Sequence, residues 1–182
     1  FTRTDIFNFC QEVNINSQLN HPLILNLIGY SQLNFKSQPK PVIVIEKLDF
    51  NLDYILESEI NQENEKWTDT KKLINIYGIA SAMSYLHANG IIHRDLKPEN
   101  IYLDKQLYPK ISGFHLSKKI DQVKEQEIKI QGTPAYLAPE TYLYGQYSTK
   151  SDVYSFSLIM YYIITNEKPY QECQRTKNEI DE

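Results

Sequence analysis

The stretch HRDLKPEN, residues 93–100, decides how the rest of the chain is interpreted. Within one short loop it supplies a carboxylate at Asp95, an ammonium group at Lys97 and an amide at Asn100. Phosphoryl transfer needs these three functions: a group that orients the attacking hydroxyl, a cation that neutralises phosphate charge, and an oxygen ligand for magnesium. The spacing therefore predicts a phosphoryl-transfer loop. The alternative interpretation is a surface loop with ordinary charges.

Around this loop, extended segments come first and helices dominate after residue 50, which indicates an α+β class with a larger helical part. The predicted elements are an amphipathic helix at 6–13, strands at 23–30 and 42–46, a short helix at 52–57, a long helix at 73–87, short strands at 91–92, 101–103 and 110–111, and a last helix at 151–164. The last helix is apolar on most sides and is expected to be buried and central. Two polar segments, 58–66 and 117–131, are predicted to be a linker and a mobile loop.

The composition sets outer limits on the fold and on the partners. The chain has 182 residues, 41% of them hydrophobic, and a net charge of −4, which suit one packed domain built as two lobes. A mildly acidic chain lacks the basic face of nucleic-acid binding proteins. The longest apolar stretch, 156–164, is too short for a membrane span. The two cysteines, Cys10 and Cys173, cannot make a disulfide framework, which favours a reducing, cytoplasmic location.

HRDLKPEN resembles the catalytic loop of eukaryotic protein kinases, and other landmarks follow in the order of that family. Residues 132–140, GTPAYLAPE, are similar to the substrate-docking loop, and residues 150–156 to the start of the central helix. Residues 44–48 resemble the hinge between the lobes. The resemblance covers nearly the whole chain and indicates the Ser/Thr or tyrosine-kinase-like branch.

The resemblance implies a bilobal kinase-like fold that is incomplete at both ends. Residues 1–48 would form a truncated N-lobe, with helix C, strands 4 and 5 and the hinge, and 49–170 a mostly helical C-lobe without its last helices. Within that lobe, 113–140 would be the activation segment. The polar tail 171–182 and the absence of an initial Met lead us to expect a piece of a larger protein. The glycine-rich loop and lysine strand of the family would precede Phe1.

Functional roles are carried over from the family position by position. Asp95 would orient the substrate hydroxyl, Lys97 would contact phosphate, and Asn100 would bind Mg²⁺. ATP and Mg²⁺ are the implied cofactors. Residues implied to surround or support the nucleotide site are Ile45, Glu46, Leu48, Tyr102 and Glu12. Of these, Ile45 would be the gatekeeper, and Glu12 would be the helix C glutamate whose lysine partner lies outside this chain.

One motif departs from the family pattern. Where the family reads DFG, this chain reads Gly113-Phe114-His115, and the flanking residues fix the register without a gap. Glycine offers no side-chain oxygen to a hard cation such as Mg²⁺. His115 replaces a glycine and restricts the backbone there. The resemblance therefore implies that phosphate transfer by this chain is weak or absent.

Several other residues have both a functional and a structural interpretation. Arg94 contacts an activation-loop phosphate in active relatives, but the segment between Ser117 and Thr133 contains no Ser, Thr or Tyr, so we expect Arg94 to be structural. Thr133 is expected to be a loop-packing hydroxyl, with phosphorylation as the alternative. Further residues expected to serve packing are Cys10, His21, His87 and Trp67, whereas Asn16 occupies a position where the family's hydrophobic spine has an aliphatic residue.

Three functions remain open on the sequence. The first is a protein kinase that transfers the γ-phosphate of ATP to Ser or Thr of a protein. The second is a pseudokinase that binds a signalling partner without catalysis. The third is an excerpt of a domain with no independent function. Expected partners are a protein substrate or a signalling protein, with no nucleic acid and no membrane.

Overall fold

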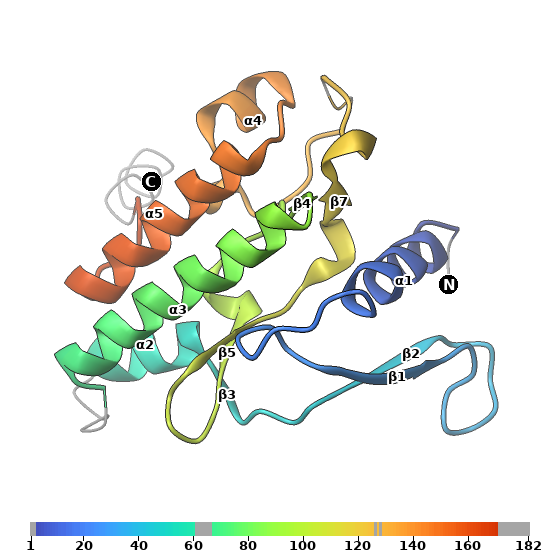
Figure 1. Cartoon of the computed structure of the whole chain (residues 1–182), viewed down its shortest axis with the longest axis horizontal. Helices are drawn as coiled ribbons and strands as arrows, with labels where there is room; N and C mark the ends of the chain where they lie inside the picture. The colour runs from blue at the N-terminus through green and yellow to red at the C-terminus, as the bar shows by residue number, and fades with distance from the viewer. Residues whose placement is uncertain (1–2, 61–66, 126, 128, 171–182) are drawn as a thin grey trace, which may run out of the picture.

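The computed structural model describes residues 3–60, 67–125, 127 and 129–170 (Figure 1). The helices are α1 (Arg3–Asn16), α2 (Leu52–Ile60), α3 (Asp69–Ala88), α4 (Pro139–Tyr144) and α5 (Thr149–Thr165). The strands are β1 (Leu27–Ser31), β2 (Val42–Ile45), β3 (Phe50–Asn51), β4 (Ile91–Ile92), β5 (Ile101–Leu103), β6 (Pro109–Ile111) and β7 (Lys118–Lys119). Short 3₁₀ turns are η1 (Pro98–Asn100), η2 (Phe114–Leu116), η3 (Ile120–Gln122) and η4 (Pro134–Tyr136). The predicted tail 171–182 and most of the predicted linker lie outside the described residues.

Helices are present in the four segments that were predicted to be helical, and the ends of α3 and α5 follow from capping residues. The apolar spacing does not give the buried face of α3, which leaves Leu73 and Tyr77 67% and 77% exposed. Thr68 caps the N-terminus of α3 by accepting a hydrogen bond from the Lys71 N–H. Ser148 and Ser151 form a reciprocal capping box at the start of α5. Asn166, in the left-handed conformation, ends α5. The two capped helices α3 and α5 lie side by side, as Figure 1 shows in green and red.

Three small antiparallel sheets connect the helices. β1 pairs with β2, β5 lies between β3 and β6, and β4 pairs with β7. The predicted strand 23–30 is wrong in its first half, because β1 begins only at Leu27. The residues before it turn away and bond to β6 instead: Ile111 N–H donates to the Leu23 carbonyl at 2.9 Å, and Leu25 N–H donates to the Ile111 carbonyl at 2.8 Å. Residues far apart in the sequence thus share backbone bonds.

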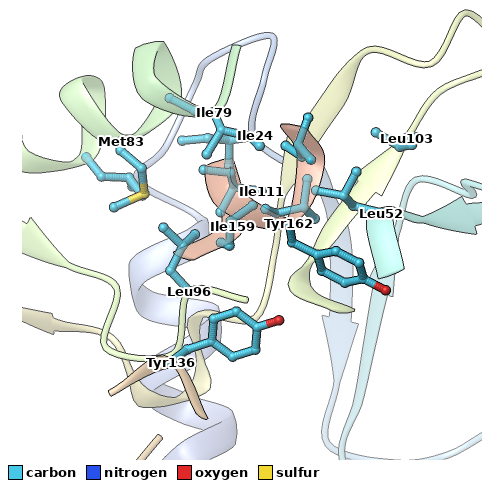
Figure 2. Close-up of a cluster of buried hydrophobic side chains, with 14 of the residues drawn as sticks. Ile24, Leu52, Ile79, Met83, Leu96, Leu103, Ile111, Tyr136, Ile159 and Tyr162 are labelled. Carbon is cyan, nitrogen blue, oxygen red and sulfur yellow. The ribbon is translucent and has the colours of Figure 1, made fainter. Parts of the chain in front are cut away.

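The hydrophobic core lies between α3, α5 and the β5–β6 ribbon (Figure 2). Ile79 on α3, Ile111 on β6 and Ile159 on α5 are fully buried, and Tyr162 inserts its ring beside them. Each such side chain contributes about 1.5–3 kcal/mol when removed from water. Trp67, just before α3, is 3% exposed, which confirms it as a packing residue. Leu96 belongs to the same cluster, so the core also packs against residues 93–100.

Four sequence expectations need correction. The segment predicted to be a mobile loop forms β7 and η3, because β7 pairs with β4. The predicted linker starts too early, since α2 continues to Ile60. Cys10 is exposed and not in the core, because it lies on a face of α1 that is open to solvent. The helix α5 is not buried on most sides, as it leaves Val153 and Ile164 51% and 61% exposed.

Candidate functional site

The loop 93–100 is held from behind by one carboxylate of α5. Asp152, 2% exposed, accepts hydrogen bonds from the N–H of His93 at 2.9 Å and of Arg94 at 3.0 Å. Its Oδ2 also lies 2.9 Å from Nε2 of His87 at the end of α3. Arg94 has a φ of +71°, a left-handed backbone that a non-glycine residue adopts only where its surroundings impose it. Asp152 thus fixes the backbone that carries the functional side chains.

The start of the loop is tied to the turn after β6 by two buried rings. His93 is fully buried, with its ring centroid 5.4 Å from that of Phe114, which is also fully buried. Its Nε2 lies 2.8 Å from the Ser112 carbonyl. Burial lowers the pKa of the His93 imidazole, and the nearby Asp152 charge only partly opposes this, so the ring is neutral near pH 7. A neutral ring can donate from Nε2 to the Ser112 carbonyl.

The structure brings together the three residues predicted for phosphoryl transfer. Asn100 Nδ2 donates to the Asp95 carbonyl at 2.8 Å and to Asp95 Oδ2 at 3.1 Å. The ammonium of Lys97 lies 3.8 Å from the same Oδ2. A fourth residue, Thr133, joins them: its hydroxyl donates to Asp95 Oδ1 at 2.8 Å and accepts from Lys97 Nζ at 2.9 Å. This site cluster consists of Asp95, Lys97, Asn100 and Thr133.

The cluster can orient a hydroxyl and neutralise an anion. Asp95 is 7% exposed, so its carboxylate has little contact with solvent. An ionised carboxylate accepts hydrogen bonds and can align a hydroxyl group for attack. Lys97 beside it offers three N–H donors for phosphate oxygens. The arrangement suits transfer of an anionic group to a hydroxyl.

Gly113 lies against the Asn100 amide of the site cluster, which leaves no room for a side chain at position 113. Gly113 has φ +82° and ψ 43°, in the left-handed region. A Cβ placed there would lie 2.6 Å from Cγ of Asn100 and 2.8 Å from its Oδ1. The amide of Asn100 therefore occupies the space beside the Gly113 α-carbon. A side chain at position 113 requires Asn100 to move.

The residues present do not fit a magnesium site of the kind that the sequence comparison implied. Mg²⁺ prefers several hard oxygen ligands in octahedral geometry. Within the described part of the chain, no three His, Cys, Asp or Glu side chains group in a way that would hold a metal ion. The side-chain oxygens in contact with Asn100 are the Asp95 carboxylate and the Ser112 hydroxyl, and each already takes part in a hydrogen bond: both Asp95 oxygens accept one, and the Ser112 hydroxyl donates to the Asn100 carbonyl at 3.0 Å. Gly113 adds no side-chain oxygen.

The residues predicted for the adenine side lie at the end of β2 and on β5. Ile45 pairs with Leu27 and is 40% exposed. The Glu46 carboxylate is bonded to the protein itself: it accepts from Lys110 Nζ at 2.8 and 3.0 Å and from Asn26 N–H at 2.7 Å. Tyr102, half-buried, lies between β3 and β6 in the central strand β5. Contacts of Ile45, Glu46, Leu48 and Tyr102 with a nucleotide stay predictions.

Glu12 lies on α1, which packs against the turn η2. Burial raises the pKa of the Glu12 carboxyl, and the charge of His115 on η2 partly offsets this. On the same helix Gln11 donates a hydrogen bond to the Ser117 carbonyl. Helix α1 is therefore coupled to the turn that carries Gly113. The side chain whose electrostatic interaction lowers the pKa of Glu12 therefore belongs to a histidine of this turn.

Thr133 is the functional residue whose contact the sequence did not reveal. It was expected to be a loop-packing hydroxyl, and it does bond within a loop, but its partners are Asp95 and Lys97. The two loops are 38 residues apart at this contact, so no local pattern predicts it. The motif GTPAY at 132–136 was a usable signal, because it marks a loop expected beside the site. Arg94 is buried with its charge inside the protein, as its structural interpretation requires.

No helix within the described ranges is both long enough and apolar enough to cross a membrane.

Comparisons with known proteins agree with this geometry. Residues 2–182 match the protein kinase domain family. Cysteine-rich receptor-like protein kinases 5 and 10 of Arabidopsis thaliana are 36% and 37% identical over 166 residues, which is 88% of this chain and 24% of each relative. Cysteine-rich receptor-like protein kinase 24 of the same plant is 37% identical, with 25% of its length covered. The chain thus spans about a quarter of the length of the curated relatives it matches.

Proposed function

The chain belongs to the protein kinase family, and from this premise we propose that it is the catalytic-loop part of a kinase that phosphorylates Ser or Thr of a protein. The family generally uses ATP and Mg²⁺ and acts on protein substrates. The observation that carries the proposal is the site cluster, in which Asp95, Lys97 and Asn100 lie within hydrogen-bond or ion-pair distance of one another or of Thr133. A cytoplasmic location stays a prediction from the cysteine content.

In this proposal Asp95 and Lys97 have separate tasks. The Asp95 carboxylate accepts the hydrogen bond of the incoming Ser or Thr hydroxyl and turns its oxygen toward the phosphorus. The acceptor hydroxyl takes the place that Thr133 now occupies at Oδ1, or shares that oxygen with it. Lys97 neutralises charge on the phosphate that is transferred. Asn100 holds the Asp95 carboxylate in orientation through its Nδ2.

The rate of transfer is proposed to be low because of position 113. No oxygen ligand projects from Gly113, and the remaining donors do not make a magnesium site. Loss of one electrostatic stabiliser of a transition state typically lowers the rate by about 10²–10³. The retained cluster and the missing ligand together predict weak transfer that still depends on Asp95.

A second candidate function is a kinase-like module that binds a partner without catalysis. The observation that favours it is the closure of Asn100 over Gly113, which fills the space of the missing carboxylate. In this candidate the fold around Asp152 and the docking loop would be kept for binding. The comparisons give this candidate no support over the kinase itself.

A transfer assay with the full-length protein tests the main proposal. We expect slow incorporation of the ATP γ-phosphate into a protein substrate, and its loss in Asp95→Ala. Asp121→Ala is the matched control, because Asp121 is an exposed aspartate on η3. Transfer that is equal in Asp95→Ala and in Asp121→Ala would contradict the proposal. No transfer by the unmodified protein would favour the binding module.

Two substitutions at position 113 distinguish the effect of a negative charge on the transfer rate from the effect of side-chain volume. Gly113→Asp adds the missing carboxylate, whereas Gly113→Asn adds the same volume without charge, and both must displace the Asn100 amide. If the missing ligand limits transfer, Gly113→Asp is expected to be faster than Gly113→Asn by about 10²-fold. Equal rates in the two variants would show that metal binding at this position does not limit the reaction.

Thermal shift with ATP distinguishes nucleotide binding from catalysis. A ligand at 100 times its Kd stabilises the folded state by about 2.7 kcal/mol. We expect a shift with ATP that is nearly the same with and without Mg²⁺, since the donors at Asn100 do not fit the ion. A large shift that requires Mg²⁺ would show that the protein assembles a metal site in solution.

A further inference from the structure

Arg94 carries a fully buried guanidinium that points toward the segment between Ser117 and Thr133. Its side chain is 0% exposed, and its Cζ lies 3.9 Å from the ring centroid of Tyr147. Nη1 donates to the Leu116 carbonyl at 3.4 Å. Nε and Nη2 have no hydrogen-bond partner within the described ranges. A buried cation of this kind is strongly destabilising unless a negative charge lies nearby.

Glu127 supplies that negative charge. Its Oε1 lies 3.8 Å from Nη2 of Arg94 and 2.6 Å from Nζ of Lys118, and its side chain is 13% exposed. Partial burial by itself would raise the pKa of the Glu127 carboxyl. The hydrogen bond from Lys118 and the charges of Arg94, Lys118 and Lys124 outweigh that effect, so the pKa lies below its usual value. Glu127 is therefore ionised at neutral pH.

The backbone fixes Glu127 in this position. Its N–H donates to the Gly145 carbonyl at 3.0 Å. Gly145 has a φ of +66°, and a Cβ there would lie 2.4 Å from the Glu127 carbonyl oxygen. Only glycine allows the two chain segments to approach this closely. Main-chain contacts with Gly145 thus position the Glu127 carboxylate next to Arg94, and these contacts do not depend on the charge of Glu127.

The same contacts lead on to the site cluster. The Tyr147 hydroxyl donates to the Gln131 carbonyl and accepts from the Gln131 N–H, both at 2.6 Å, while its ring covers Arg94. The next residue, Gly132, has a φ of +114°, and a Cβ there would lie 2.8 Å from the Arg94 carbonyl oxygen. Thr133 follows and donates to Asp95. Order around Arg94 is therefore linked to the position of the Thr133 hydroxyl.

We propose that Glu127 is a positioning residue, whose carboxylate is the built-in counter-anion of Arg94 and Lys118 and folds the loop against Thr133 without any covalently added negative charge. Residues 118–132 contain no Ser, Thr or Tyr that could carry a phosphate, which agrees with an anion supplied by the sequence itself. This inference rests on the proposed function only where transfer is measured. The ordering of the loop can be measured without it.

The test uses hydrogen–deuterium exchange of the amides of 129–133 in the full-length protein, treated with phosphatase. Glu127→Gln removes the charge at nearly constant volume, Glu127→Asp keeps it, and Glu125→Gln removes an exposed charge from the same loop. We expect Glu127→Gln to exchange about five- to thirtyfold faster than the unmodified protein. Glu125→Gln should be unchanged, and Glu127→Asp should recover most of the protection.

A pH series shows whether the charge is responsible. Because the folded pKa of Glu127 is lowered, its stabilisation is complete above the unfolded value of 4.5 and is lost as the pH falls through the folded value. The difference between Glu127→Gln and the unmodified protein should therefore be largest at neutral pH and should decrease once the pH falls below 4.5. Arg94, Lys118 and Lys124 are the charged groups that face Glu127, and they stay cationic over this range.

Three results would overturn the proposal. The first is equal exchange in Glu127→Gln and Glu125→Gln. The second is equal loss of protection in Glu127→Asp and Glu127→Gln at matched thermal stability, which would assign the effect to packing. The third is loop protection that disappears when phosphatase is added. If transfer is measurable, Glu127→Gln should also lower kcat while KM for ATP is unchanged; with no measurable transfer, the exchange results alone decide.

Discussion

The catalytic loop 93–100 and the turn 113–116 lie against each other, but only the loop keeps the side chains that phosphoryl transfer needs. In the loop, the Asp95 carboxylate accepts hydrogen bonds from Asn100 and Thr133. In the turn, position 113 has no side chain at all. The backbone that leads into the turn is nevertheless bonded to the loop, because Ser112 N–H donates to the Asn100 carbonyl at 2.8 Å.

This contrast shows that the scaffold and the chemistry of the site depend on different residues. The turn is fixed by Phe114, which is 0% exposed, and by the left-handed backbone of Gly113. The missing carboxylate contributes nothing to either feature. A chain can therefore lose a metal ligand at this place and retain the fold around it. The following predictions test that separation, beginning with the largest effect.

Phe114→Ala should be the most damaging change in the turn. Truncating a fully buried Phe leaves a cavity and typically costs about 3–5 kcal/mol of unfolding free energy. Phe35→Ala is the matched control, because Phe35 is 94% exposed. Chemical denaturation measures both. A loss for Phe114→Ala as small as that for Phe35→Ala would mean that the turn is not part of the core.

Asp152→Asn should weaken the attachment of the loop itself. An asparagine can accept through one oxygen only, so either His93 N–H or Arg94 N–H faces an amide group and loses its acceptor. Leaving a buried donor unpaired costs about 1–3 kcal/mol. Asp121→Asn, at an exposed position, should be neutral. Unchanged stability of Asp152→Asn would show that the loop is anchored elsewhere.

Gly113→Ala should have a smaller effect that comes from the backbone and from Asn100. A non-glycine residue in the left-handed region costs about 1–2 kcal/mol, and the new Cβ must push the Asn100 amide aside. Gly29→Ala is the control, since a Cβ at Gly29 meets nothing within 4 Å and its φ is not positive. Denaturation midpoints should separate the two variants. Equal midpoints would mean that the turn adapts freely.

The free energy of unfolding should depend on pH in the way expected for a buried, neutral His93 imidazole. Its folded pKa is below the unfolded value of 6.5, so its stabilisation is complete above pH 6.5 and is lost as the pH falls. One proton gives a slope of at most about 1.4 kcal/mol per pH unit. His93→Asn should flatten the curve of unfolding free energy between pH 7 and 5. A steep curve in His93→Asn would assign the titration to another group.

The sequence was sufficient for features that depend on local pattern. The helices α1, α2, α3 and α5 lie where the sequence predicted helices, with ends that differ by a few residues, whereas the short helix α4 was not predicted. Asp95, Lys97 and Asn100 were predicted to act together because they are at most five residues apart, and one short loop must hold them near one another. The family match confirms the fold that these patterns indicated.

What the sequence could not predict depends on long-range contacts. The closure of Asn100 over Gly113 needs the relative placement of two loops. The folded part of 117–131 was predicted to be mobile because it is highly charged, but Lys118, Glu127 and the buried Arg94 compensate one another. The exposure of Cys10 depends on which face of α1 is covered, and apolar periodicity alone does not decide that. The roles of the adenine-side residues remain predictions.

The backbone hydrogen bonds between Ile111 and residues 23–25 affect how the protein unfolds. Both backbone groups of Ile111, its N–H and its carbonyl, are satisfied by a segment that precedes the predicted lobe boundary at residue 48. Separating the two parts would leave two buried polar groups without partners in the middle of the core. The polypeptide on either side of that boundary is therefore expected to melt in a single cooperative transition.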